Sequence, residues 1–243
     1  MSLTPERDAL GQLVGARLPS WVPARRPPRQ VLEGLRVRLE PLERVRHAAA
    51  LFAAYAEDAS GVMWTYLPVG PFATATEVAA WVAKVADGTD PQFVAIIERA
   101  TGRALGVAAY LAIDPLHGSI EVGHIAFSPR LSRTAMATEA MVLMMAQAFA
   151  LGFRRYEWKC DTLNQPSRQA ALRLGFAPEG LFRQHRVVKG RSRDTAWFSI
   201  IDSEWPALHA AFQTWLSPDN FDAQGKQALR LSELTQAAVD GLR

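Results

Sequence analysis

Residues 123–175 read GHIAFSPRLSRTAMATEAMVLMMAQAFALGFRRYEWKCDTLNQPSRQAALRLG, and this stretch decides the fold. Its hydrophobic period changes along the chain in the order strand, turn, helix, strand, helix. We expect a strand that ends over 123–129, a polar turn over 130–138, a helix over 137–151, a strand over 156–161 and a short helix over 164–175. Such an alternation predicts a domain of mixed α and β structure.

The predicted turn over residues 130–138 contains polar and small side chains and leads directly into the long helix. The first N–H groups of a helix have no partner inside it, and the helix dipole adds positive potential there. The turn therefore predicts an anion site, of a kind that suits a pyrophosphate.

Two motifs in this stretch resemble those of the GNAT family, the GCN5-related N-acetyltransferases. They are Ser132-Arg133-Thr134-Ala135-Met136-Ala137-Thr138-Glu139-Ala140 and Asn164-Gln165-Pro166-Ser167, the latter followed by Leu174-Gly175-Phe176 and Glu179-Gly180. The family's turn reads Gln/Arg-x-x-Gly-x-Gly/Ala, so Ser132 and Ala135 depart from it and Ala137 fits. The resemblance runs from about residue 35 to residue 202 and is strongest to the branch that acetylates the N-termini of ribosomal proteins.

The resemblance implies a mixed, mostly antiparallel α/β (α+β) sheet, flanked by helices, whose central strands over 119–127 and 154–161 splay apart. It implies acetyl-CoA as cosubstrate. The pantetheine arm is expected to bond to the backbone of Ile125, Ala126 and Phe127. The residues expected at the pyrophosphate are Ser132, Arg133, Thr134, Ala135, Met136, Ala137 and Thr138, with Arg130 or Arg133 adding charge.

Asn164 and Ser167 each have a structural and a functional interpretation. Asn is a good helix N-cap, and Ser often satisfies backbone groups in a first turn. In the family, the Asn that matches Asn164 bonds to pantetheine, and in the ribosomal-protein branch a serine at the position of Ser167 protonates the departing thiolate. The tyrosine that many GNAT enzymes use for this purpose is replaced here by Ala171.

The general base is harder to identify from the sequence. An α-amino group has a pKa of about 8 and is partly neutral at pH 7, whereas a lysine amine, with a pKa of about 10.4, depends more on a base to remove its proton. Glu121, His124 and Asp161 lie on the strands beside the expected site, and Glu121 is the first candidate. Strand alternation puts Glu121 and His124 on opposite faces unless a bulge intervenes. The alternatives are an ion-paired Glu121 and a structural His124.

Cys160 is expected to be a buried thiol and not an acyl-carrying nucleophile, because no His or acid is spaced to activate it. By alternation it shares a strand face with Trp158. Trp64, Tyr66 and Phe72 either line an acceptor pocket or belong to the core. A methionine stripe in the long helix is interpreted as core.

Composition limits the class of protein. The chain has 243 residues, 49% of them hydrophobic, a net charge of +3 and one cysteine. A single cysteine excludes an intrachain disulfide framework and, with no secretory signal, favours a cytoplasmic location. No metal motif or membrane-spanning run is present. One basic stretch, Arg183, Arg186, Lys189, Arg191 and Arg193 with His185, is either a ligand-attracting surface or the solvated edge of a hairpin.

We expect three regions: an extended, proline-rich arm over residues 1–32, an acetyltransferase-like domain over 33–203, and a C-terminal helix and tail over 204–243. Trp21 is a candidate to pin the arm to the domain. The further strands are expected over 35–39, 92–98, 105–113 and 119–127 and in a hairpin about Lys189-Gly190, and further helices over 44–57, 74–86 and 204–216.

The leading hypothesis is acetyl transfer to a primary amine, on a protein N-terminus or a small molecule, by direct attack on acetyl-CoA. A non-catalytic module that binds CoA or acyl-CoA is a second hypothesis, because the turn departs from the family pattern at two positions. A third is a basic protein associated with RNA or ribosomes, whose binding would depend strongly on salt.

Overall fold

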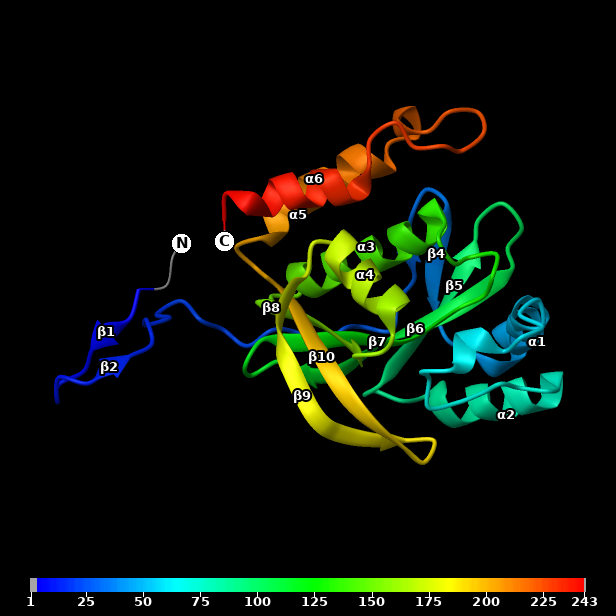
Figure 1. Ribbon diagram of the computed structural model, residues 1–243, viewed down its shortest axis with the longest axis horizontal. Coiled ribbons are helices and arrows are strands. Elements are labelled where there is room, and N and C mark those ends of the chain that lie inside the picture. Colours follow the sequence, from blue (N-terminus) through cyan, green and yellow to red (C-terminus); the bar gives the residue numbers. More distant parts are fainter. Residues whose placement is uncertain (1–3, 243) are drawn as a thin grey trace.

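A computed structural model describes residues 4–242, and its centre is an eight-stranded sheet (Figure 1). The strands lie in the order β3-β4-β5-β6-β7-β8-β10-β9, and every neighbouring pair is antiparallel except β7 and β8. Their bounds are β3 Leu32–Glu33, β4 Val37–Pro41, β5 Gln92–Glu98, β6 Ala104–Asp114, β7 Ser119–Phe127, β8 Arg155–Asp161, β9 Ala177–Val188 and β10 Arg191–Ile201. The mixed, mostly antiparallel sheet flanked by helices is thereby confirmed.

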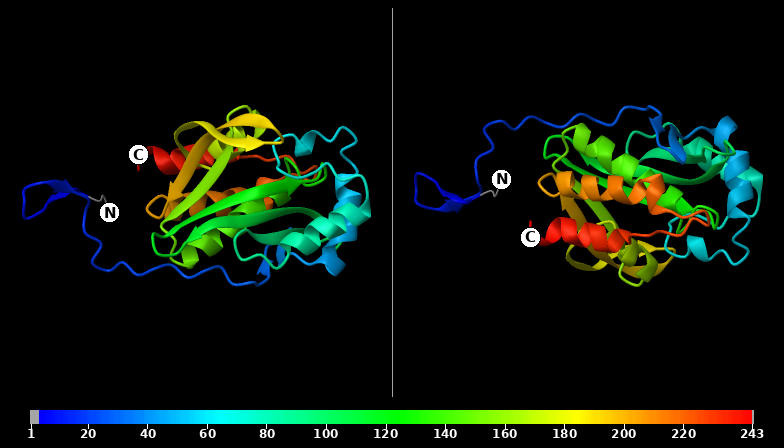
Figure 2. Two further views of the ribbon diagram at one scale, coloured as in Figure 1. Left: turned by 90° about the horizontal axis from the view of Figure 1, so that it is seen from below. Right: turned by 90° about the horizontal axis from the view of Figure 1, so that it is seen from above.

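Helices cover the two faces of the sheet unequally. On one face, α1 (Arg44–Tyr55) and α2 (Ala75–Val85) pack mainly over β5 and β6, with the short η1 helix (Val62–Trp64) between them. On the other, α3 (Ala135–Ala150), α4 (Gln165–Arg173), α5 (Trp205–Leu216) and α6 (Leu231–Asp240) share one core with the sheet. Figure 2 shows α5 and α6 from above and the exposed sheet with the β9–β10 hairpin from below. Beyond α1 and α2, no helix of the described residues therefore covers this face of β7, β8 and β10.

The ends of the helices follow their sequence. Thr134 caps α3, with Oγ1 accepting from the N–H of Ala137 at 3.2 Å. Asn164 caps α4 in the same way, with Oδ1 accepting from the N–H of Ser167 at 3.2 Å. Both helices begin where the polar side chain offers an acceptor to an otherwise unpaired donor.

The only parallel pair among the strands of residues 4–242 opens into a wedge. β7 and β8 pair from Ser119↔Arg155 to Val122↔Trp158 and no further, although both strands continue. From Lys159 onward, β8 pairs with β10 alone. The expected splay of the two central strands is therefore present, and it begins after Val122.

A bulge distorts β7 directly beside this wedge. Val107 on β6 pairs with Ala126, while Ala109 pairs with Gly123, so β7 contains one extra residue between these pairs. His124 takes up the strain, with φ of 49°. A bulge changes which face each later side chain occupies. This is the exception to simple alternation that allows Glu121 and His124 to share a face.

The C-terminal segment belongs to the main core. The sequence offered no placement for residues after 220, yet α6 packs against α5 and α4, and Leu231 and Val239 are buried with the sheet core. A turn of η2 helix (Pro218–Asn220) and a loop join α5 to α6. Gln227 in that loop accepts a hydrogen bond from Trp215 Nε1 at 2.7 Å.

The N-terminal arm is extended apart from a small hairpin of β1 (Glu6–Arg7) and β2 (Leu13–Val14) (Figure 2). Trp21 does attach it, because its Nε1 donates to the carbonyl of Leu116 at 3.3 Å. The predicted strand over 35–39 was placed too early. Leu35 is 60% exposed in the turn before β4, and the strand begins at Val37.

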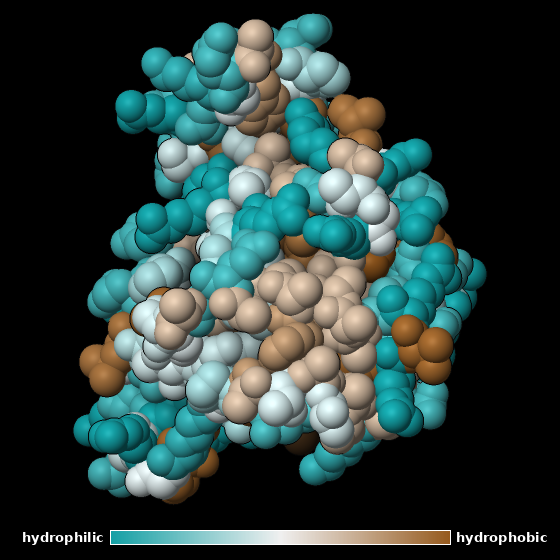
Figure 3. Space-filling view, turned by 90° about the vertical axis from the view of Figure 1, so that its right-hand side faces the viewer, coloured by the Kyte–Doolittle hydropathy of each residue, from teal (hydrophilic) through white to brown (hydrophobic). Residues whose placement is uncertain are grey.

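The β9–β10 hairpin turns at Lys189-Gly190, as expected, and both residues have positive φ. The Lys189 ammonium donates to the carbonyls of Trp64 at 2.9 Å and Gly70 at 3.0 Å. The hairpin tip is thereby tied to the loop between α1 and α2. Figure 3 shows the α1–α2 end of the molecule, where weakly hydrophobic residues gather inside a hydrophilic border. Among residues 4–242, no helix is both long and apolar enough to cross a bilayer.

Candidate active site at the splayed strands

Two cavities adjoin at the wedge between β7 and β8. The hairpin cavity, of about 360 Å³, lies between the open face of these strands, the β9–β10 hairpin, residues 63–68 and the start of α4. The helix cavity, of about 610 Å³, lies beside the starts of α3 and α4 and reaches Gln227. Because Phe127, Trp158 and Ala170 line both, the cavities meet through the sheet.

The start of α3 presents donors to the helix cavity. The backbone N–H groups of Arg133, Ala135 and Met136 have no hydrogen-bond partner within residues 4–242. Arg133 has φ of 61°, and its side chain lines the cavity. Unpaired N–H groups at the positive end of a helix dipole bind phosphate well. The turn therefore fits a pyrophosphate in spite of its departures from the family pattern.

The positive side chains near this turn divide into two groups. Arg130 lies 3.5 Å from Glu98 and is occupied by that ion pair. Arg133 and Arg173 line the helix cavity, and Arg173 also donates to Thr138 Oγ1 at 3.1 Å. Burial lowers the pKa of Arg173, yet a guanidinium stays charged at neutral pH. The pair expected to meet phosphate oxygens is thus Arg133 and Arg173.

The start of α4 delivers polar groups to the hairpin cavity. Asn164 and Ser167 both line it, on the side where the two cavities meet. Ser167 Oγ accepts a hydrogen bond from Trp158 Nε1 at 3.0 Å and also interacts with the Cys160 thiol. With Trp158 as donor, the hydroxyl keeps its own proton to give. The cap predicted at Asn164 is therefore present, and Ser167 lies in the same turn of helix with its side chain at the cavity.

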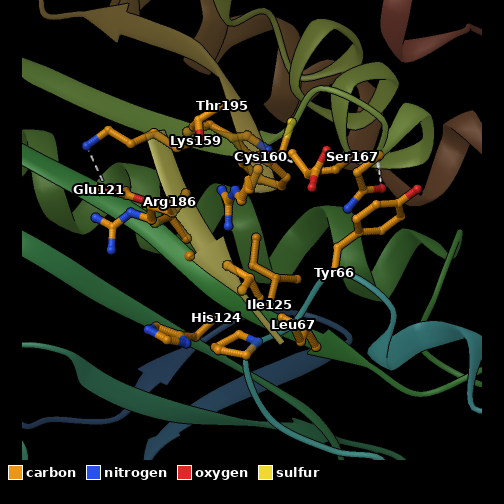
Figure 4. A pocket seen from close by; sticks show the side chains of 18 of the residues that line it. Tyr66, Leu67, Glu121, His124, Ile125, Lys159, Cys160, Ser167, Arg186 and Thr195 are labelled. Atoms are coloured by element: carbon orange, nitrogen blue, oxygen red, sulfur yellow. Dashed lines mark hydrogen bonds and ion pairs between the residues drawn. The ribbon is translucent and has the colours of Figure 1, made fainter. Parts of the chain in front are cut away.

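A chain of buried charges forms the floor of the hairpin cavity. Lys159 Nζ lies 2.8 Å from Glu121 Oε2 (Figure 4). It also lies 2.7 Å from Glu157 Oε2. The same ammonium lies 3.8 Å from the centre of the Trp197 ring. Burial raises the pKa of Glu121, and the Lys159 charge opposes that rise. Glu121 is consequently a stronger base than an exposed carboxylate, although it is also the ion-paired group that the alternative interpretation describes.

His124 lies in the same cavity as Glu121 because of the bulge. Its ring is tilted against Phe93, with centroids 5.2 Å apart. Burial lowers the pKa of His124, and the positive charge of Arg186 lowers it further. The imidazole is therefore neutral at pH 7 and able to accept a proton. It is a second candidate for the base.

Cys160 is buried, with 5% exposure, in the core that contains Trp158. Burial raises the pKa of its thiol, so the thiolate is scarce at neutral pH. The prediction of a buried, unactivated thiol is confirmed, although the hairpin cavity also touches this side chain.

Of the three aromatic residues considered for the acceptor pocket, only Tyr66 lines the hairpin cavity. Its hydroxyl donates to the carbonyl of Leu163 at 3.1 Å. Trp64 is 3% exposed and packs edge-on against Phe72 and Tyr55 in the α1–α2 core. The core interpretation therefore holds for Trp64 and Phe72.

The predicted site residues divide between the two cavities. Ser132, Arg133, Thr134, Ala137 and Thr138 line the helix cavity, and Glu121, Ile125, Asn164 and Ser167 line the hairpin cavity. Phe127 lines both. The Ala126 side chain instead packs in the α1–α2 core, and its carbonyl accepts from Tyr55 Oη at 3.4 Å. Ala135 and Met136 face the helix cavity with neither side chain and contribute only their N–H groups.

Several cavity residues were missed at the level of sequence. Lys159, Arg173 and Gln227 carry no local motif, so nothing marked them. Arg186 and Arg193 stood in the basic stretch, where charge alone favoured a solvated hairpin edge. The structure keeps that interpretation for the exposed Arg183 and Arg191 but places Arg186, Arg193 and His185 on the cavity wall. Among residues 4–242, no cluster of three His, Cys, Asp or Glu side chains is arranged to hold a metal ion.

Known proteins resemble this chain over much of its length. The family model described as "Acetyltransferase (GNAT) domain" matches residues 36–177. The crystal structure of a GCN5-related N-acetyltransferase from Brucella melitensis is similar, with 49% sequence identity and a TM-score of 0.88, over 90% of this chain and 100% of that one.

Two curated relatives match over shorter stretches. The uncharacterized N-acetyltransferase p20 of Bacillus licheniformis is 27% identical over 145 residues, or 58% of this chain and 80% of p20. The ribosomal-protein-serine acetyltransferase of Escherichia coli (strain K12) is 31% identical over 103 residues, or 41% of this chain and 56% of that protein.

Proposed function

The chain belongs to the GNAT acetyltransferase family and is an acyltransferase, and on this premise we propose that it moves an acetyl group from acetyl-CoA to a primary amine by direct attack. The observation that carries the proposal is the wedge after Val122↔Trp158, with a cavity on each side of it. Cosubstrate and acceptor can then approach one reaction point from opposite faces of the sheet. Bound acetyl-CoA supplies an activated acyl group on a thiol leaving group.

In this proposal the helix cavity holds the nucleotide end of the cosubstrate. The N–H groups of Arg133, Ala135 and Met136 bind pyrophosphate oxygens, with the guanidiniums of Arg133 and Arg173 beside them. Ala137 is buried at the wall of this cavity. Ala137→Asp should weaken cosubstrate binding, because it adds bulk and a negative charge where the pyrophosphate is proposed to lie. The pantetheine arm follows the unpaired edge of β7 after Val122, at the backbone of residues 125–127, and Asn164 stands at its inner end.

Ser167 is the proposed general acid, because it lies where the cavities meet and Trp158 donates to its Oγ. That hydrogen bond stabilises the oxygen when it gives up its proton. Glu121 is the proposed base, with neutral His124 as the alternative in the same cavity. Since a thiol pKa of about 8.5 makes it a fair leaving group, the acid contributes only part of the rate.

The acceptor is proposed to be a protein N-terminus or a small-molecule amine. The match to a ribosomal-protein-serine acetyltransferase supports the first, and the hairpin cavity of about 360 Å³ is large enough for the end of a peptide or for one small molecule. An α-amino group is the easier nucleophile, because its pKa of about 8 leaves a useful neutral fraction at pH 7.

The direct test is thiol release from acetyl-CoA in the presence of peptides, polyamines and aminoglycosides. We expect Ser167→Ala to lower kcat with little change in the affinity for CoA. Trp158→Phe removes the donor to Ser167 but keeps the serine, and Ser192→Ala on exposed β10 serves as a matched control. CoA binding without thiol release toward any amine would overturn transfer and favour a CoA-binding module. A Ser167→Ala enzyme with normal turnover at saturating acceptor, where chemistry limits the rate, would remove the acid role.

A further inference from the structure

The β9–β10 hairpin carries several buried polar atoms with no hydrogen-bond partner among the described residues. They are His185 Nδ1, Arg193 Nε, Thr195 Oγ1 and Trp197 Nε1. Thr195 is 1% exposed, and it lines the hairpin cavity with Arg193 and His185. Buried polar groups in native proteins are nearly always satisfied, since an unpaired one costs about 1–3 kcal/mol. Three of these four atoms belong to residues that line the cavity, so the cluster indicates a ligand there.

Most of this cluster can donate a hydrogen bond. Arg193, Thr195 and Trp197 alternate along one face of β10, so their polar atoms point to the same side of the sheet. The guanidinium and indole N–H groups are donors only, and the hydroxyl and imidazole can act as either donor or acceptor. The missing group is consequently one that accepts several hydrogen bonds.

The hairpin brings two positive charges together at this wall. Arg186 and Arg193 stand directly opposite each other in the β9–β10 register. Like charges in that position destabilise a strand pair. Neither guanidinium lies within 4.0 Å of a carboxylate among the described residues. Glu121 and Asp161 also line the cavity, and the Arg186 charge acts on Glu121. Glu121 is ion-paired with Lys159, and Asp161 Oδ1 accepts from the N–H of Leu163.

A bulge in β9 lies next to His185 and Arg186, the two β9 residues before Val188 that line the cavity. Arg186↔Arg193 and Phe182↔Thr195 are successive pairs, so three residues of β9 stand opposite one of β10. Gln184 has φ of 49°, and its N–H donates to Asp194 Oδ1 at 2.6 Å. Bulges beside active sites often re-aim side chains in this way. Figure 4 shows Arg186 over the strand that carries Glu121, and Thr195 beside Lys159.

From these observations we infer that the hairpin cavity binds an acceptor that carries an anionic group, a carboxylate or a phosphate, a few bonds from its amine. The inference rests on the proposed function, in which the acceptor amine enters this cavity. Arginine forks bind both anions in a bidentate manner. The positive wall repels a bare ammonium ion, and an attached anion offsets that repulsion. The phosphates of the cosubstrate belong to the helix cavity, on the other side of the wedge.

The test is calorimetric titration of matched acceptor pairs into the protein, with and without CoA. One pair is an amidated Ser-Asp-Ala peptide and its Ser-Asn-Ala isostere, which report a side-chain carboxylate. β-Alanine and β-alaninamide report a small-molecule carboxylate, and O-phosphoethanolamine and ethanolamine report a phosphate. We expect the anionic member of at least one pair to bind at least about tenfold more tightly, the effect of one charge-assisted hydrogen bond.

Variants connect this preference to the hairpin. Arg193→Gln and the more exposed Arg186→Gln should each reduce the preference to about threefold or less while the neutral member binds as before. Arg191→Gln, an exposed arginine of the same hairpin that does not line the cavity, should retain it. Equal affinities in every pair, binding of neither member of any pair, or a preference that survives in both cavity variants would overturn the inference. Because the titrations need no turnover, failure of acetyl transfer is recognised separately in the thiol-release assay.

Discussion

Glu139 provides the sharpest test of how the fold supports the predicted cosubstrate turn. It lies one turn into α3 and is 5% exposed. Its Oε1 accepts from the N–H of Leu35 at 3.0 Å, and its Oε2 accepts from the N–H groups of Arg36 at 2.7 Å and Val37 at 2.8 Å. One carboxylate thereby satisfies three consecutive backbone donors and joins the start of β4 to α3. The substitution to examine is Glu139→Gln.

The expected loss follows from these three contacts. Each hydrogen bond to a charged group contributes about 1.5–3 kcal/mol, whereas a neutral one contributes about 1 kcal/mol. Glutamine retains one carbonyl oxygen for two of the donors, and its NH₂ group must face the third, which leaves a buried donor against a donor. We therefore expect Glu139→Gln to lower the free energy of unfolding by about 3–4 kcal/mol. For a chain of this length that corresponds to a fall in Tm of roughly 10 °C.

The assay is urea unfolding at pH 7, followed by circular dichroism, together with thermal melts. Glu233→Gln is the matched control, because Glu233 is an exposed residue of α6 with a 3.7 Å ion pair to Arg230. It should change the stability by no more than about 0.5 kcal/mol. If the free energy of unfolding of Glu139→Gln is within about 1 kcal/mol of that of the natural chain, the three-donor contact does not hold α3 to β4 as argued.

Three further predictions concern the hairpin cavity. Cys160→Ala should cost about 1 kcal/mol of stability but keep most activity. Intact-protein mass spectrometry with acetyl-CoA alone should find no adduct on Cys160. A kinetically competent adduct would contradict direct attack. Lys189→Met should release the hairpin tip from the carbonyls of Trp64 and Gly70. We expect KM for the acceptor to rise several-fold while the affinity for CoA is unchanged. An unchanged acceptor KM would show that these hydrogen bonds are dispensable. The raised pKa of Glu121 means that the folded state holds this proton more tightly than the unfolded state; the stabilisation is complete below about pH 4.5 and is lost as the pH rises through the folded pKa. The free energy of unfolding of Glu121→Gln, measured by urea titration relative to the natural chain, should therefore increase between pH 4 and pH 7. A decrease over this range would contradict a raised pKa for Glu121.

Much of the fold follows from local sequence. The caps at Thr134 and Asn164 depend on a side chain and an N–H three residues later, so they form wherever the adjacent helix forms. The start of α4 and the Lys189-Gly190 turn were predicted for the same reason. The family's motifs lie in these local elements, and the match to residues 36–177 confirms the family that they indicated. Here a short-range hydrogen bond or a turn preference decides the structure, and the chain needs no distant partner for it.

The sequence alone could not predict the bulges, the placement of the C-terminal tail or the positive charge at the wall of the hairpin cavity. His124 shares a cavity with Glu121 because β7 contains one residue more than β6 requires, and strand pairing determines this. Gln227 reaches the helix cavity because α6 packs beside α5 and α4. Arg186 and Arg193 were visible as charge in the sequence, yet only the register of β9 with β10 brings them face to face without an acid between them. Period and composition describe a residue's neighbours along the chain, whereas these features arise between segments that meet only when the sheet has closed.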